Sequence, residues 1–121
     1  DMQGGSLVPL FKGHVPKHWR THFYYHYYEF PGAHSVARHY GVTNGRHKLI
    51  HFYQNNEWEL FDLKKDPNEL QSVYGNSDYK TIESDLLAEL KRLRVHYKVP
   101  EEDPVPPKRK RPNQPNRPKK K

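Results

Sequence analysis

The sequence predicts an α+β fold: a small antiparallel sheet of three to four strands, packed by one C-terminal helix and followed by a disordered basic tail. Three observations lead to it. Short aromatic and β-branched runs alternate with turn residues, which is typical of strands joined by hairpins. One longer stretch repeats apolar residues at steps of three or four, which indicates a helix. The last stretch is rich in proline and basic residues and contains no aromatic residue.

The 121 residues allow one small domain, and only 33% of them are hydrophobic. The formal net charge is +7, and the basic residues gather at one end: residues 101–121 hold eight Lys and Arg against three acids. The positive charge is therefore mainly a property of the tail. The chain begins with Asp1 rather than Met, so we expect a piece of a longer protein.

Residues 1–22 are predicted to be an extended connector, because Pro9, Gly13 and Pro16 interrupt any regular element there. The folded unit is predicted over residues 23–98. It starts with the run FYYHYY at 23–28, in which almost every side chain is aromatic. This run indicates a strand buried on both faces or lying at an interface.

Three more strands are predicted at 35–42, 46–53 and 57–63. Asn44 and Gly45 separate the first two, and both residues tolerate the positive φ of a tight hairpin turn. The turn before the last strand falls at Gln54-Asn55-Asn56. The four strands therefore form one antiparallel sheet.

A helix is predicted from about 79 to 97. Its apolar stripe consists of Ile82, Leu86, Leu90, Leu93 and Tyr97. Ser77 or Asp78 is expected to cap its start. The stripe requires an apolar partner, and the sheet face with Trp58 and Leu60 is the candidate.

Residues 99–121 are predicted to be a disordered tail, because seven of the eleven prolines fall there and little apolar surface is present to be buried. No stretch reaches the roughly 18 apolar residues that span a bilayer, and the N-terminus does not have the pattern of a signal peptide. The absence of cysteine excludes disulfides, thiolate catalysis and Cys-ligated zinc, but leaves the compartment open.

Three segments resemble the C-terminal region of type I (formylglycine-dependent) sulfatases: residues 5–13 (GSLVPLFKG), 46–50 (RHKLI) and 59–69 (ELFDLKKDPNE). The third is the most specific, because E-L-F/Y-D-L followed by x-x-D-P-x-E marks where the family's C-terminal sheet leads into its closing helix. The resemblance runs in order from about residue 3 to 97. The stretch 24–42 looks closest to the N-sulfoglucosamine sulfohydrolase and N-acetylglucosamine-6-sulfatase branch.

The resemblance implies a parent enzyme that hydrolyses sulfate esters or sulfamates of sulfated carbohydrates, such as glycosaminoglycans, in an extracytoplasmic compartment. Its formylglycine would arise in C/S-x-P-x-R, and calcium would sit among carboxylates and an Asn. The chain contains neither pattern. We therefore expect no catalytic residue, metal ligand or cofactor in this chain, which alone should be inactive, and a catalytic domain upstream or in trans as its partner.

In such enzymes the loop after the first strand of the C-terminal sheet can reach the mouth of the active site, and here that loop is residues 29–34. A sulfated sugar would favour cationic and donor side chains. His34, Arg38 and His39 are therefore the candidate substrate-binding residues. The alternative is that they are ordinary strand and loop residues on a solvated face.

The histidines and the basic tail suggest other functions. His14, His18, His22 and His26 are spaced by four, which would align metal ligands on a helix, but Pro16 argues against a helix there. The Lys and Arg runs favour a free-standing polyanion-binding module for nucleic acid or sulfated glycan. The aromatics lie in the folded part and the charges in the tail, so the two do not form one nucleic-acid site.

The aromatic run 23–28 is also open to two interpretations. It is either a platform on which carbohydrate stacks or a surface that docks on the missing catalytic domain. We expect docking.

Overall fold

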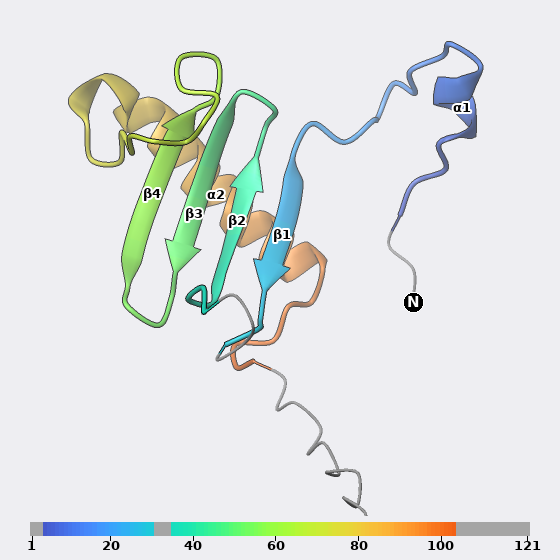
Figure 1. Cartoon of the computed structure of the whole chain (residues 1–121). Coiled ribbons are helices and arrows are strands. Elements are labelled where there is room, and N and C mark those ends of the chain that lie inside the picture. Colours follow the sequence, from blue (N-terminus) through green and yellow to red (C-terminus); the bar gives the residue numbers. More distant parts are fainter. Residues whose placement is uncertain (1–3, 31–34, 104–121) are drawn as a thin grey trace, which may run out of the picture.

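The structure is a computed structural model, and it describes residues 4–30 and 35–103. Its elements are α1 (Val8–Phe11), β1 (Phe23–Tyr27), β2 (His39–Thr43), β3 (His47–Phe52), β4 (Glu57–Asp62), the 3₁₀ turn η1 (Ser77–Tyr79) and α2 (Lys80–His96). The strands form one antiparallel sheet in the order β1-β2-β3-β4, and α2 crosses one face of it (Figure 1). The predicted α+β fold is confirmed. The predicted disorder of the tail falls on residues 104–121, outside the described residues.

The core lies between the middle of the sheet and α2. Val42, Leu49 and Leu60 stand opposite one another on β2, β3 and β4, and all three are fully buried. Leu86, Leu90 and Leu93 of α2 pack on this row, with Trp58 beside it. The predicted pairing of the leucine stripe with the face of Trp58 and Leu60 is confirmed, because alternate strand residues share a face.

The turn between β2 and β3 differs in detail from the prediction. Gly45 alone takes a positive φ, of 88°, whereas Asn44 works through its side chain. The Asn44 Oδ1 accepts the N–H groups of Arg46 at 3.0 Å and His47 at 2.7 Å. Asn44 therefore closes the hairpin by local hydrogen bonding.

The start of α2 is also shifted. Neither Ser77 nor Asp78 caps it, because η1 precedes the helix and Asn76 caps that turn by accepting the N–H of Asp78 at 3.0 Å.

The N-terminal connector contains a single helical turn, α1. The expectation that Pro9 excludes any regular element was wrong, since proline suits the first turn of a helix. α1 lies apart from the sheet (Figure 1).

Asp62, the acid of the ELFDL motif, is the centre of a hydrogen-bond network with Arg46 and Tyr79. Its side chain is 2% exposed, and its oxygens accept hydrogen bonds from Arg46 at 3.4 and 3.2 Å and from the Tyr79 hydroxyl at 3.3 Å. The bonds from Arg46 lower the pKa of Asp62 to about 2. This carboxylate thereby joins the β2–β3 turn to β4 and η1.

The core predicts a large effect of one truncation. Leu90→Ala removes a buried side chain from the α2–sheet contact, and we expect a loss of about 2–5 kcal/mol in the free energy of unfolding. Leu70→Ala is the control, since Leu70 is 83% exposed and should change stability by less than about 0.5 kcal/mol. Urea denaturation followed by circular dichroism measures both. Equal losses would contradict the assigned core.

The Asp62 network predicts a pH-dependent effect. Because the folded-state pKa of Asp62 lies below its usual 3.8, the ionised carboxylate stabilises the fold above that pH, and the contribution is lost as pH falls through about 2. Asp62→Asn should therefore be less stable than the unmodified chain near neutral pH. The gap should shrink to about half between about pH 5 and about pH 3. Urea denaturation across this range tests it, with the exposed Asp85→Asn as control. A gap independent of pH would refute the ionic role.

Candidate functional site

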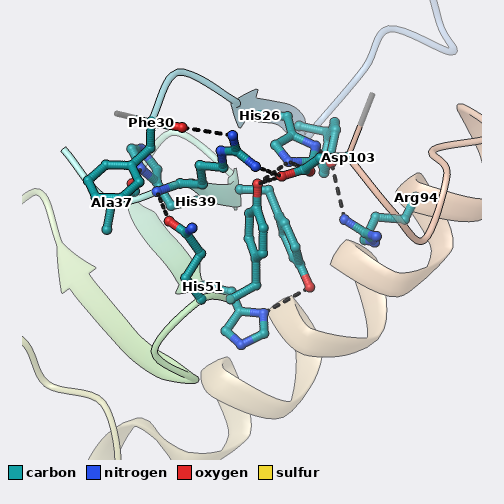
Figure 2. Close-up of polar contacts among 12 residues, drawn as sticks. His26, Phe30, Ala37, His39, His51, Arg94 and Asp103 are labelled. Carbon is teal, nitrogen blue, oxygen red and sulfur yellow. Dashed lines mark hydrogen bonds and ion pairs between the residues drawn. The ribbon is translucent and has the colours of Figure 1, made fainter. Parts of the chain in front are cut away.

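A cluster of polar side chains lies at the end of the sheet where β1 stops and β2 begins (Figure 2). Asp103 is its centre. Its Oδ2 accepts hydrogen bonds from Arg38 Nη1 at 3.0 Å and from the Tyr53 hydroxyl at 2.6 Å, and His26 Nε2 lies 3.6 Å from its Oδ1. Residues 99–103 belong to the predicted disordered tail, but the Asp103 side chain contacts residues beside the sheet. Asp103 thereby fastens the chain after α2.

Arg38 closes the base of the segment between β1 and β2. Its Nη2 donates a hydrogen bond to the Phe30 carbonyl at 2.7 Å, and its backbone N–H donates to Gln54 Oε1 at 3.0 Å. The guanidinium is therefore held between Phe30 and Asp103. Its buried Nε has no partner among the described residues.

The other two predicted substrate residues lie differently. His34 lies outside the described residues. His39 starts β2 and turns to the sheet face away from α2, where its ring stacks on Tyr27 with centroids 5.2 Å apart. Its Nδ1 is 2.8 Å from the Ala37 carbonyl, to which it donates. The structure therefore brings Arg38 and His39 to one end of the sheet but gives their side chains separate partners.

The sheet face opposite α2 is aromatic. Tyr25, Tyr27, His39 and Phe52 lie on it, and no described helix or strand covers them (Figure 1). Gly41 makes room for Tyr25, because a Cβ at that position would lie 2.6 Å from the Tyr25 hydroxyl. The hydroxyls of Tyr25 and Tyr27 are buried without a partner among the described residues. We call these four residues the aromatic face.

β1 is only partly buried, so it is not the strand covered on both faces that one prediction allowed. It forms the edge of the sheet, and its alternate residues serve two different surfaces. The second reading, a strand at an interface, stays a prediction.

The α2 side holds a second group of aromatic rings, in contact with a cation. The Arg94 guanidinium lies 4.1 Å from the Tyr40 ring centre, and His51 donates to or accepts from the Tyr40 hydroxyl at 2.8 Å. His26 is 7% exposed, and burial lowers its pKa to about 4. At neutral pH His26 is uncharged and Arg94 supplies the positive charge.

Sequence reasoning missed Arg94, Tyr53 and Asp103. Arg94 falls four residues after Leu90, so the helical period could have placed it near the sheet. Asp103 gave no such signal, because its partners lie 50 and 65 residues earlier in the chain.

The histidines predicted as a possible metal set do not gather. Residues 4–30 and 35–103 contain no group of three or more His, Cys, Asp or Glu side chains that could hold a metal ion. His22 lies instead 3.7 Å from Glu89. Within the same residues, no helix is both long and apolar enough to cross a membrane.

Comparison with known proteins places this geometry in a family. Residues 1–96 match the family described as N-sulphoglucosamine sulphohydrolase, C-terminal. The chain belongs to this family. The resemblance to the C-terminal region of sulfatases in the glucosamine branch is thereby confirmed.

Individual relatives agree with the family. The chain is 44% identical over 101 residues to the N-acetylglucosamine-6-O-sulfatase of Bacteroides thetaiotaomicron. Its fold is similar to BT4656, solved in complex with its substrate D-glucosamine-2-N,6-O-disulfate, with a TM-score of 0.79, 41% identity and 84% of this chain covered. It is also similar to BT1596, a 2-O GAG sulfatase, with a TM-score of 0.69, 25% identity and 80% covered.

The chain spans only about a fifth of these relatives. The alignment with the Bacteroides enzyme includes 81% of this chain but only 18% of that enzyme. The matches to the two solved chains cover 21% of each. The match is thus to one region of a sulfatase, of which the described sheet and helix form the folded part.

The Asp103 cluster predicts a local effect on dynamics. Asp103→Ala removes the acceptor shared by Arg38 and Tyr53, so the Arg38 and His39 amides should exchange with solvent about tenfold faster while the core of α2 is unchanged. Hydrogen exchange followed by NMR measures this. Glu102→Ala is the control, since Glu102 is exposed. Unchanged exchange at Arg38 would show that Asp103 does not hold this segment.

Proposed function

We propose that this chain is the C-terminal subdomain of a sulfatase that hydrolyses sulfate esters or sulfamates of sulfated carbohydrates. It would contribute scaffold and one wall of the substrate pocket, but not the nucleophile. The observation that carries this proposal is the family match over residues 1–96 by a chain that spans about a fifth of its relatives. The names of two relatives refer to sulfated glucosamine, which supports the proposed substrate class.

The aromatic face is the proposed contact with the catalytic domain. Its rings are half-buried and lie on a sheet surface that no described helix or strand covers, and partly exposed apolar surface of this kind marks interaction sites. Docking would therefore complete the packing of this face.

The calcium and formylglycine of the parent enzyme are proposed to belong to that catalytic domain. The residues of this chain do not fit either group. Cysteine is absent, and no serine is followed two positions later by proline. Asp62 and Asp103 each already accept hydrogen bonds from an arginine and from a tyrosine hydroxyl. An extracytoplasmic location is proposed with the family.

His34, Arg38 and His39 remain the proposed contribution to the pocket wall. For Arg38 the contacts support positioning: its bonds to Phe30 and Asp103 fix the base of the segment that precedes β2. These bonds would hold the pocket wall at a constant distance from a bound sugar, which favours productive binding.

The free-standing polyanion-binding module gains no support. The folded part carries the sulfatase family's pattern, and the densest Lys and Arg runs lie outside the described residues. The sulfatase role is therefore the function we propose.

A sulfate-release assay tests this role. The catalytic domain of the parent sulfatase is expressed as one polypeptide with this chain and also separately from it. We expect sulfate release from a heparin-type oligosaccharide by the joined polypeptide, and by the two pieces mixed, but not by this chain alone. Release by this chain alone would overturn the proposal, and so would the absence of release from the joined, folded polypeptide.

A matched pair of variants tests the docking face. Phe52→Asp places a charge on the aromatic face, and it should weaken the association of the mixed pieces at least about tenfold, because an unpaired charge at an apolar interface is costly. Ala88→Asp introduces the same charge at an exposed position of α2, on the other side of the sheet, and should leave association unchanged. Analytical ultracentrifugation of the mixed pieces measures both, and circular dichroism verifies that each variant is folded. Equal affinities would place the contact elsewhere.

A further inference from the structure

A second concave surface lies on the α2 side of the sheet. It is a cavity of about 380 Å³ between the C-terminal half of α2, the segment that follows it and the sheet. Its lining residues are Tyr40, Trp58, Leu87, Leu90, Lys91, Arg94, Val95, Lys98, Val99 and Glu101. This volume falls in the range of small-molecule sites. It is separate from the aromatic face, which lies across the sheet.

The interior of this cavity is apolar. Leu87, Leu90, Val95 and Val99 supply aliphatic walls. The rings of the site do not offer an open stacking surface: His51 stacks on Trp58 with centroids 3.8 Å apart, and the Arg94 guanidinium lies over Tyr40. A ligand would therefore meet side-chain methyl groups and ring edges, which suit an apolar body better than the hydroxyl groups of a sugar.

The rim of the cavity is cationic. Lys91 and Arg94 lie three residues apart on α2, and Lys98 follows just after the helix, whereas Glu101 is the single acid that lines the cavity. Among the described residues, neither Lys91 nor Lys98 makes an ion pair. The C-terminus of a helix carries partial negative charge, so Arg94, in the last turn of α2, also lies where the helix stabilises a cation.

We propose that this cavity is a binding site for a small amphipathic organic anion, an apolar ring that bears one carboxylate or sulfate group. The ring would occupy the leucine and valine walls, and the anionic group would reach the Lys91 and Lys98 ammonium groups at the rim. This inference goes beyond the sulfatase role. Because the cavity and the aromatic face lie on opposite sides of the sheet, docking through that face would leave the cavity open.

The probe that tests the proposal is benzenesulfonate, with benzenesulfonamide as its neutral counterpart. Titration of the isotope-labelled chain should shift the Trp58 indole N–H and the Leu87 and Leu90 methyl signals in a saturable manner. The sulfonamide should bind at least about fivefold more weakly, since it lacks the charge. Equal affinities for the two probes would overturn the ionic part of the proposal.

Paired variants locate the charge. Lys91→Gln combined with Lys98→Gln should weaken benzenesulfonate binding about fivefold and leave the sulfonamide unchanged. Lys64→Gln combined with Lys80→Gln removes the same charge from exposed residues that do not line the cavity, and should change neither. Shifts confined to residues outside the cavity, or equal losses in both double variants, would refute the site.

A third probe distinguishes the two sources of such an anion. Glucosamine 6-sulfate carries the charge on a polyhydroxylated ring and should bind more weakly than benzenesulfonate, because the aliphatic walls cannot pair its hydroxyl groups. Tighter binding of the sugar would overturn the assignment of an apolar ligand. All of these measurements use this chain without turnover, so their failure is distinguishable from failure of the sulfatase proposal.

Discussion

The packing of three α2 leucines on the row Val42–Leu49–Leu60 is the contact on which the rest of the structure depends. Side chains alternate between the faces of a strand, so burying this row fixes the orientation of every other strand residue. His39 and Gly41 must then face away from α2, and Tyr40 must face toward it. The two surfaces to which we assign proposed functions follow from this one register: the aromatic face and the cavity beside α2.

The polar contacts at the ends of the sheet then attach the remaining segments. Asp62 binds the β2–β3 turn and η1 to β4, whereas Asp103 binds the chain after α2 to the opposite end of the sheet. Each carboxylate is largely shielded from water and accepts more than one hydrogen bond, including one from an arginine. A shielded carboxylate without such donors would be costly, so each acid is coupled to its particular partners.

Much of the fold could be predicted from the sequence because its signals are local. The aromatic and apolar runs predicted the strands within a few residues, and the leucine spacing predicted α2 and its partner face. The misplaced helix cap shows the limit of such signals, since Ser77, Asp78 and Asn76 are all good caps and only the backbone decides among them. The contacts of Asp103 were beyond reach, because they join segments at least 50 residues apart and involve no repeating pattern.

The chemistry of the buried acids bears on what this region can do within a sulfatase. A hard cation such as calcium needs several oxygen ligands that are not already bound to competing positive charges. Asp62 and Asp103 face guanidinium groups at 3.2 and 3.0 Å, so a cation at either acid would have to displace an arginine. The acids are thus used to hold turns and the chain after α2 in place. That use supports a division of labour in which the catalytic domain supplies the metal and the nucleophile, while this region supplies shape.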